Sequence, residues 1–237
     1  PIGAVEHGDG LFRVAFGAAV LRAPALVIAT GGPSIPKMGA TGFAYDLARQ
    51  FGLKVVQPRP ALVPLTLGGN DVLFRELSGV SAEVVAKCNK AAFREAALFT
   101  HRGLSGPAVL QISSYWQGGS PIRLNLAPEV DLPARLQEAK LRSKKLLGNE
   151  LASLVPSRLA EAWVGQDPSL QRSCSEVPDK ALNKLAEALS NWNLTPTGSE
   201  GYKKAEVTLG GVDTRDVSSQ TMESKQPGLY FIGEVMD

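Results

Sequence analysis

Residues 24–53 constrain the fold of this chain more than any other stretch of its sequence. They read PALVIATGGPSIPKMGATGFAYDLARQFGL: an apolar segment, a double glycine, and then apolar side chains that recur at helical spacing. Gly52 follows the last of these, where a helix C-terminal cap is expected. The pattern predicts a fully buried strand at Leu26 to Ala29, a glycine turn, and an amphipathic helix over residues 41–52.

Strand patterns also precede this stretch and return at the end of the chain. In residues 11–16, Phe12, Val14 and Phe16 alternate with Leu11, Arg13 and Ala15, and an apolar run follows the turn at Gly17; this predicts two more short strands. Near the C-terminus, a glycine turn at Gly210-Gly211 and an apolar run at residues 229–232 predict further strands. Strand segments at both ends of the chain thus bracket a middle section of different character.

The first part of the middle section is expected to form a small antiparallel sheet or barrel. Pro58, Pro60 and Pro64 fit an edge strand or a crossing between domains better than the centre of a sheet, so a domain boundary is placed there. Ser105 is expected to cap a short helix that begins near Pro107. Strands are predicted from short alternating runs separated by glycine turns, at residues 72–77, 83–87, 97–100 and 122–126.

The second part of the middle section is helical. Between Leu132 and Leu194 the sequence carries Leu or Ala at every third or fourth position, which predicts two or three helices in a separate lobe. The expected fold class is therefore mixed, α+β or α/β. Its expected parts are a first segment of strands, turn and helix, a barrel-like domain, a helical lobe and a set of return strands, at residues 1–57, 58–130, 131–195 and 196–237.

Charge and the rare residue types narrow the functional classes. The 25 basic and 23 acidic side chains give a formal net charge of +2, so neither nucleic acid nor a membrane is expected as a partner. Cys88 and Cys174 are far apart in sequence, which argues against zinc and disulfides and makes a cytoplasmic location the expectation. With two histidines and no clustered Asp or Glu motif, no metal site is expected.

Three stretches carry groups suited to chemistry, and each has a plainer structural alternative. The ATGG turn lets backbone N–H groups approach a ligand, or serves only to connect a strand to a helix. In FTHRGLSGP, the side chains of His101, Arg102 and Ser105 suit an anion or a substrate, although a solvated histidine would look the same. Glu234 and Asp237 follow an apolar strand, where open α/β sheets bind ligands; surface charge is the alternative.

Six separated motifs, taken in order, carry a family resemblance. They are LVIATGGPSIPKMGATGFAYDLARQFG, PALVPL, FTHRGLSGPAVLQIS, LGGV, TMESK and GLYFIGEVMD. Together they resemble the BaiN-like flavoproteins, also described as the aminoacetone-oxidase-type FAD-binding family of NAD(P)/FAD-dependent oxidoreductases. The resemblance implies a partial Rossmann-like FAD domain interrupted by an inserted antiparallel β-barrel and a small helical lobe.

The resemblance also implies a reaction and the residues that serve it. FAD is the implied cofactor, NAD(P)H the electron donor and a small molecule the substrate, with hydride passing through the flavin to an unidentified acceptor. The residues implied beside the flavin and its ribityl chain are Thr30, Gly31, Gly32, Gly210, Gly211, Gly233, Glu234 and Asp237. The residues implied as catalytic candidates on the substrate side are His101, Arg102 and Ser105.

The chain departs from the family pattern at both ends. Members begin with a strand and G-x-G-x-x-G, whose glycines admit the FAD pyrophosphate at a helix N-terminus, and they continue into a second glycine-rich turn. Neither feature is present, so a middle segment is expected that binds FAD weakly or not at all and is inactive alone. Its strand edges would permit self-association. The alternative is a non-catalytic module in which the barrel and helices bind a ligand or partner.

Overall fold

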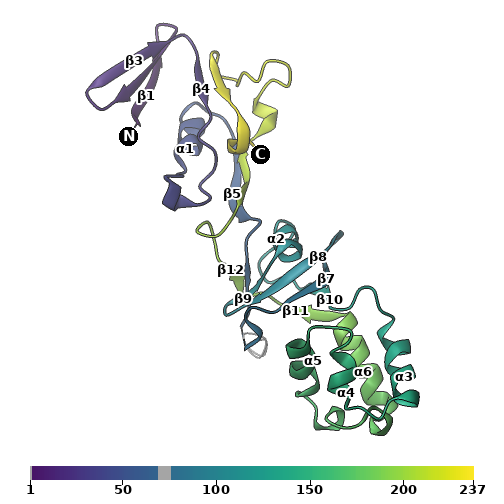
Figure 1. The fold of residues 1–237 in the computed structure, drawn as a ribbon. Helices are drawn as coiled ribbons and strands as arrows, with labels where there is room; N and C mark the ends of the chain where they lie inside the picture. Colours follow the sequence, from purple (N-terminus) through teal and green to yellow (C-terminus); the bar gives the residue numbers. More distant parts are fainter. Residues whose placement is uncertain (1, 69–75) are drawn as a thin grey trace. The chain divides into compact units, whose positions relative to one another are not determined.

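The chain forms two compact units in the computed structural model, which describes residues 2–68 and 76–237 (Figure 1). The first unit combines Pro1–Ala61 with Gly201–Asp237, and the second unit is Leu62–Glu200. The two ends of the chain therefore share one unit, and the second unit is inserted between them. The fold is mixed α/β, as the sequence predicted.

Short strands form most of the first unit. An antiparallel sheet runs in the order β1-β2-β3, and a separate parallel pair joins β4 to β14. The strands are β1 Ile2–Gly8, β2 Leu11–Phe16, β3 Ala19–Ala23, β4 Leu26–Ile28 and β14 Leu229–Phe231. The strands expected between residues 11 and 29 are confirmed, as is the strand expected at residues 229–232. In the register of the parallel pair, Ile28 lies opposite Phe231.

The prediction that the strand at Leu26 to Ala29 is fully buried is wrong. Val27 is 53% exposed, whereas Ile28 is buried in the hydrophobic core of the first unit. Among the described residues, β14 is the single strand neighbour of β4, and adjacent side chains of a strand point to opposite faces. One face of β4 is therefore covered and the other is open.

Helix α1 spans Phe43–Gln50 and confirms the helix predicted over residues 41–52. A short 3-10 helix precedes it, at Pro36–Met38. Gly52 ends α1 with a positive φ of 76°, so the glycine cap expected from the sequence is present. The residues of α1 buried against the core of the first unit are Ala44, Tyr45, Leu47 and Ala48.

The prediction of a turn at Gly210-Gly211 is wrong. Both glycines lie inside β13 (Val207–Val212), which pairs antiparallel with β5 (Val55–Ala61) and shifts register there in a β-bulge. A Cβ atom at Gly210 would lie 2.5 Å from a carbonyl oxygen of β5, and one at Gly211 would collide with a carbonyl in the 3-10 helix after β14. The two glycines therefore permit close backbone packing within the first unit.

The second unit contains a seven-stranded antiparallel sheet in the order β11-β10-β7-β8-β9-β6-β12. The antiparallel sheet is confirmed, but the strands of the described residues form no closed barrel, because β11 and β12 each pair on one side. Residues 72–75 of the strand predicted at 72–77 lie outside the described residues. The strands are β6 Leu65–Thr66, β7 Ser81–Cys88, β8 Ala91–Thr100, β9 Gly103–Ser105, β10 Ile122–Asn125, β11 Trp192–Leu194 and β12 Gly198–Ser199.

Helix α2 (Pro107–Ser113) packs against β8 and β7 (Figure 1). Its N-cap is Gly106, and the capping role expected for Ser105 is wrong because Ser105 is the last residue of β9. Gly106 has a φ of 87°, and a Cβ atom there would lie 2.8 Å from the backbone of β8. Glycine is therefore required where the chain passes from β9 into α2.

Four helices lie between β10 and β11 and gather into a lobe (Figure 1). They are α3 Leu132–Arg142, α4 Leu147–Leu151, α5 Ser157–Val164 and α6 Asp179–Ser190, where two or three were predicted. Trp192 of β11 stacks on Phe99 of β8 at 6.1 Å between ring centroids and meets Trp163 of α5 at 5.7 Å. One hydrophobic core thus runs through sheet and lobe, and the domain boundary expected at residue 130 stays a prediction. In the part of the chain that the structure describes, every helix is too short or too polar to span a bilayer.

Candidate functional site

The carboxyl ends of β4 and β14 bring two of the predicted ligand-binding segments together. Because the strands are parallel neighbours, the chain leaves both at the same edge, into residues 30–32 after β4 and into residues 233–234 after β14. The Ile232 N–H donates to the carbonyl of Ile28 at 3.0 Å, which extends the pairing to this edge. The carboxyl edge of parallel strands is where open α/β sheets bind ligands.

Thr208 of β13 connects these two segments. Its backbone N–H donates to Glu234 Oε1 at 2.7 Å, and its hydroxyl lies at hydrogen-bond distance, 2.7 Å, from the Ser34 hydroxyl. Gly32 packs on the same side chain, since a Cβ atom at Gly32 would lie 2.5 Å from Thr208 Oγ1. One buried residue thus holds both Glu234 and the glycine turn. The sequence analysis missed Thr208 and Ser34, because their contact joins positions 174 residues apart.

The glycines of the first unit serve two different purposes. Gly31 and Gly233 have φ values of 68° and 77°, and a Cβ atom at either position would meet nothing within 4 Å. Their backbone is therefore open to an incoming group, and Thr30 beside Gly31 is exposed as well. Gly210 and Gly211 are explained by the close packing of β13 against β5 and against the 3-10 helix after β14, and their place beside a flavin stays a prediction.

Tyr45 of α1 is a further residue that the sequence analysis missed. It is 3% exposed, and its hydroxyl lies 3.1 Å from the position that a Cβ atom of Gly32 would take. The hydroxyl has no hydrogen-bond partner among the described residues. Burial raises the pKa of Tyr45, and Tyr202 and Glu234 raise it further, so the group remains an O–H at neutral pH. Buried polar groups are normally paired, so this hydroxyl stands out.

Asp237 lies at the end of β13, where its N–H donates to the carbonyl of Val212 at 3.0 Å. Its side chain is exposed. The neighbouring Asp213 differs, because Arg215 Nε donates to its Oδ1 at 2.8 Å and the hydrogen bonds from Arg215 lower the pKa of Asp213 to about 2. The carboxylate of Asp213 is thus occupied by hydrogen bonds from Arg215, whereas the carboxylate of Asp237 is accessible to a ligand.

In the second unit, His101 and Arg102 form the turn between β8 and β9, and both are exposed. The Thr100 hydroxyl oxygen shapes this turn by accepting the backbone N–H of Arg102 at 3.3 Å. Arg102 Nη1 lies 3.5 Å from Glu200 Oε2 in an ion pair. Ser105 is half-buried at the far end of β9. The structure therefore brings His101 and Arg102 together in one turn and places Ser105 apart from them.

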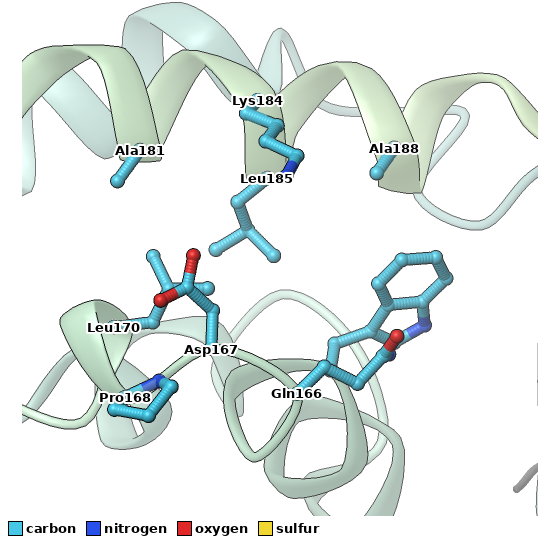
Figure 2. Close-up of a pocket in the computed structure, with 9 residues that line it drawn as sticks. Gln166, Asp167, Pro168, Leu170, Ala181, Lys184, Leu185 and Ala188 are labelled. Carbon is cyan, nitrogen blue, oxygen red and sulfur yellow. The ribbon is translucent and has the colours of Figure 1, made fainter.

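The helical lobe contains a separate cavity of about 260 Å³ (Figure 2). Its lining includes the apolar residues Trp163, Leu170 and Leu185 and the polar residues Gln166, Asp167 and Lys184. Figure 2 shows Leu185 pointing from α6 toward Leu170 and Asp167 on the opposite wall. The Ser169 N–H donates to Asp167 Oδ1 at 2.8 Å, and the hydrogen bonds from Ser169 lower the pKa of Asp167. The lobe thus offers a second site of mixed polarity, which the sequence analysis did not predict.

Comparisons with known proteins identify relatives along most of the chain. The chain is 50% identical over 220 residues to the ribosomal RNA dihydrouridine synthase of Escherichia coli K12. It is 45% identical over 216 residues to the ribosomal RNA dihydrouridine synthase of Haemophilus influenzae. It is 28% identical over 233 residues to the 3-dehydro-bile acid delta(4,6)-reductase of Clostridium scindens.

Each of these comparisons covers 90% of this chain but only 54–56% of the relative. The chain therefore spans about half the length of the curated relatives it matches. A family model described as HI0933-like protein barrel and H2TH domain matches residues 59–207, which is more than half of the chain. The chain belongs to the HI0933-like family.

Proposed function

We propose that this chain is part of a flavin-dependent reductase of carbon–carbon double bonds whose substrate is uridine in ribosomal RNA. Two relatives at 45% and 50% identity are named for forming dihydrouridine in ribosomal RNA, and a third is named as a reductase. These names share one type of chemistry, the addition of two hydrogens to a double bond. They support the substrate, while support for the cofactor comes from the residues of the first unit.

The observation that carries the proposal is the meeting of the glycine turn and Glu234 at the carboxyl edge of the β4-β14 pair. The residues there fit the polar parts of a flavin. Gly31 and Gly233 leave open backbone, and Tyr45 carries a buried hydroxyl in need of a partner. Glu234 uses one oxygen for Thr208 and keeps further lone pairs for ribityl hydroxyls. The parallel pair with α1 then corresponds to part of a Rossmann-like domain.

Reduction of a double bond conjugated to a carbonyl adds a hydride to one carbon and a proton to the other. A bound flavin would supply the hydride, and NAD(P)H would reduce it again. The turn at Gly31 and the carboxylate of Glu234 would hold and orient it. By the family resemblance, His101 is the candidate proton donor. Arg102, already held by Glu200, offers its remaining N–H groups to a phosphate or carbonyl oxygen of the substrate.

An RNA substrate departs from the expectation, drawn from total charge, that nucleic acid is not a partner. Charge is unevenly spread in the helical lobe, where Lys144, Lys145 and Arg172 are all exposed. The Leu147 N–H donates to the Arg172 carbonyl at 3.0 Å and the Cys174 N–H to the Lys145 carbonyl at 2.9 Å, so the two segments lie side by side. None of the three cations forms an ion pair with a described residue. We call these three residues the basic ridge; its charge suits RNA phosphates.

A reduction assay tests the proposal. The intact protein that contains this chain is supplied with FAD, NADH or NADPH, and ribosomal RNA transcribed in vitro, and the digested nucleosides are analysed by mass spectrometry. We expect dihydrouridine to form in step with the oxidation of NAD(P)H, and reactions without FAD to yield none. Flavin that is reduced and reoxidised while every uridine stays intact would contradict the RNA substrate but not the redox role.

The alternative, a non-catalytic binding module, predicts a different outcome for flavin itself. FAD is titrated into this chain and into the intact protein while flavin fluorescence is followed. Binding to the intact protein supports the oxidoreductase. If both proteins leave the fluorescence unchanged, the oxidoreductase proposal fails, and the lobe cavity and basic ridge then favour ligand or RNA binding without redox chemistry.

A further inference from the structure

The Tyr45 hydroxyl is buried at the glycine turn without a hydrogen-bond partner among the described residues. A hydroxyl in this state has lost its bonds to water and gained none, which destabilises the protein that contains it. Replacing the hydroxyl by hydrogen would remove that cost without changing the shape of the ring. Because the unpaired hydroxyl of Tyr45 lowers the stability of the ligand-free protein, its role is best explained by a hydrogen bond to a bound ligand.

The polar neighbours of Tyr45 already bind one another. The hydroxyls of Ser34 and Thr208 lie 2.7 Å apart, and the Thr208 N–H is taken by Glu234 Oε1. Beside them, Gly31 leaves open space next to the backbone. Because the pKa of Tyr45 is raised by its burial, the hydroxyl keeps its proton and can donate it in a hydrogen bond. The missing group is therefore an acceptor that binds at the glycine turn.

We propose that the Tyr45 hydroxyl donates a hydrogen bond to an acceptor atom of the flavin held at the glycine turn. The inference rests on the proposed function and adds a residue to it. According to this inference, the Tyr45 hydroxyl strengthens the binding of the cofactor and does not stabilise the apoprotein. A hydroxyl that served the fold alone would behave in the opposite way, so the two roles are separable by measurement.

The test compares the intact wild-type protein with Tyr45→Phe and with Tyr202→Phe as a matched control in the same unit. The dissociation constant for FAD is measured by flavin fluorescence, and thermal unfolding is followed for the apoprotein and for the FAD-loaded protein. We expect Tyr45→Phe to weaken FAD binding about tenfold, the effect of one lost hydrogen bond. The apoprotein of Tyr45→Phe should unfold at the wild-type temperature or above it, and Tyr202→Phe should leave FAD affinity unchanged.

Two results would overturn the inference. Unchanged FAD affinity in Tyr45→Phe would show that the hydroxyl does not contact the cofactor, while the proposed function would stand on wild-type binding. A lower unfolding temperature of the Tyr45→Phe apoprotein would show that the hydroxyl is already paired in the empty protein, by water or by a neighbour. If the wild-type protein does not bind FAD, the proposed function itself fails, and the inference fails with it.

Discussion

At Gly32, the absence of a side chain decides whether the glycine turn can pack on β13. A Cβ atom there would lie 2.5 Å from Thr208 Oγ1 and 2.7 Å from Thr208 Cβ, so the backbone would have to move. We expect Gly32→Ala to lower the free energy of unfolding by about 1–3 kcal/mol, as overpacking does. Urea unfolding measures the change. Gly8→Ala is the control, because a Cβ atom at Gly8 meets nothing within 4 Å; equal losses in both variants would contradict the packing argument.

Asp213 gives the first unit a defined sensitivity to acid. Hydrogen bonds from Arg215 lower the pKa of Asp213 from 3.8 to about 2. Because the folded pKa is the lower one, the stabilisation is complete above about pH 5 and is lost as the pH falls through the folded pKa. Asp213→Asn should therefore lower the free energy of unfolding near neutral pH and flatten its decline in acid, as urea titrations at a series of pH values would show. A variant whose stability declines as steeply as the wild type would refute the role of this pair.

At the level of elements, local sequence patterns were enough to predict those helices and strands whose structure depends on nearby residues alone. The spacing of apolar residues and the glycine cap located α1, since both signals lie within the helix. The dipeptide Gly210-Gly211 is ambiguous, because a turn and a β-bulge use glycine for the same backbone freedom and only the pairing with β5 separates them. Tyr45 and Thr208 could not be found at all. Their roles depend on contacts between segments near the two ends of the chain, and a local sequence pattern does not predict such contacts.

The basic ridge is the element on which an RNA substrate should depend. Lys144→Glu combined with Lys145→Glu removes two positive charges and adds two negative ones on an exposed turn, so the fold should persist. We expect RNA affinity to fall about tenfold or more, with a shallower dependence on salt because fewer counterions are released. Fluorescence anisotropy over a range of salt concentrations measures both. The double variant Lys203→Glu with Lys204→Glu, also exposed but in the first unit, is the control; equal losses would mean that net charge alone matters.

At the scale of the whole molecule, the proposed cofactor site is formed by two segments that are far apart in the sequence, whereas the inserted unit is formed by one continuous segment. The first unit joins Pro1–Ala61 to Gly201–Asp237, so Gly31 and Glu234 become neighbours only after the chain has passed through the second unit and returned. The family match at residues 59–207 falls mainly on that second unit. We therefore expect the flavin contacts proposed for this chain to lie in its first unit and the RNA contacts proposed for it to lie in its second unit.

The final prediction concerns what this chain can do alone. It carries the turn and the carboxylate proposed to meet the flavin ring and ribityl chain, but its sequence contains no G-x-G-x-x-G to cradle the FAD pyrophosphate at a helix N-terminus. We therefore expect the purified chain to be colourless and to bind FAD at least about a hundredfold more weakly than the intact protein, by equilibrium dialysis.

Flavin mononucleotide supplies the matched control, because it keeps the ring, the ribityl chain and one phosphate but has no adenosine. If the difference between the two proteins comes from pyrophosphate and adenosine contacts, it should shrink strongly with this ligand. A chain that stays yellow through purification would contradict the prediction, since the ring and ribityl contacts would then suffice for tight binding. A difference that persists with flavin mononucleotide would instead mean that the isolated chain does not hold Gly31 and Glu234 in their binding arrangement.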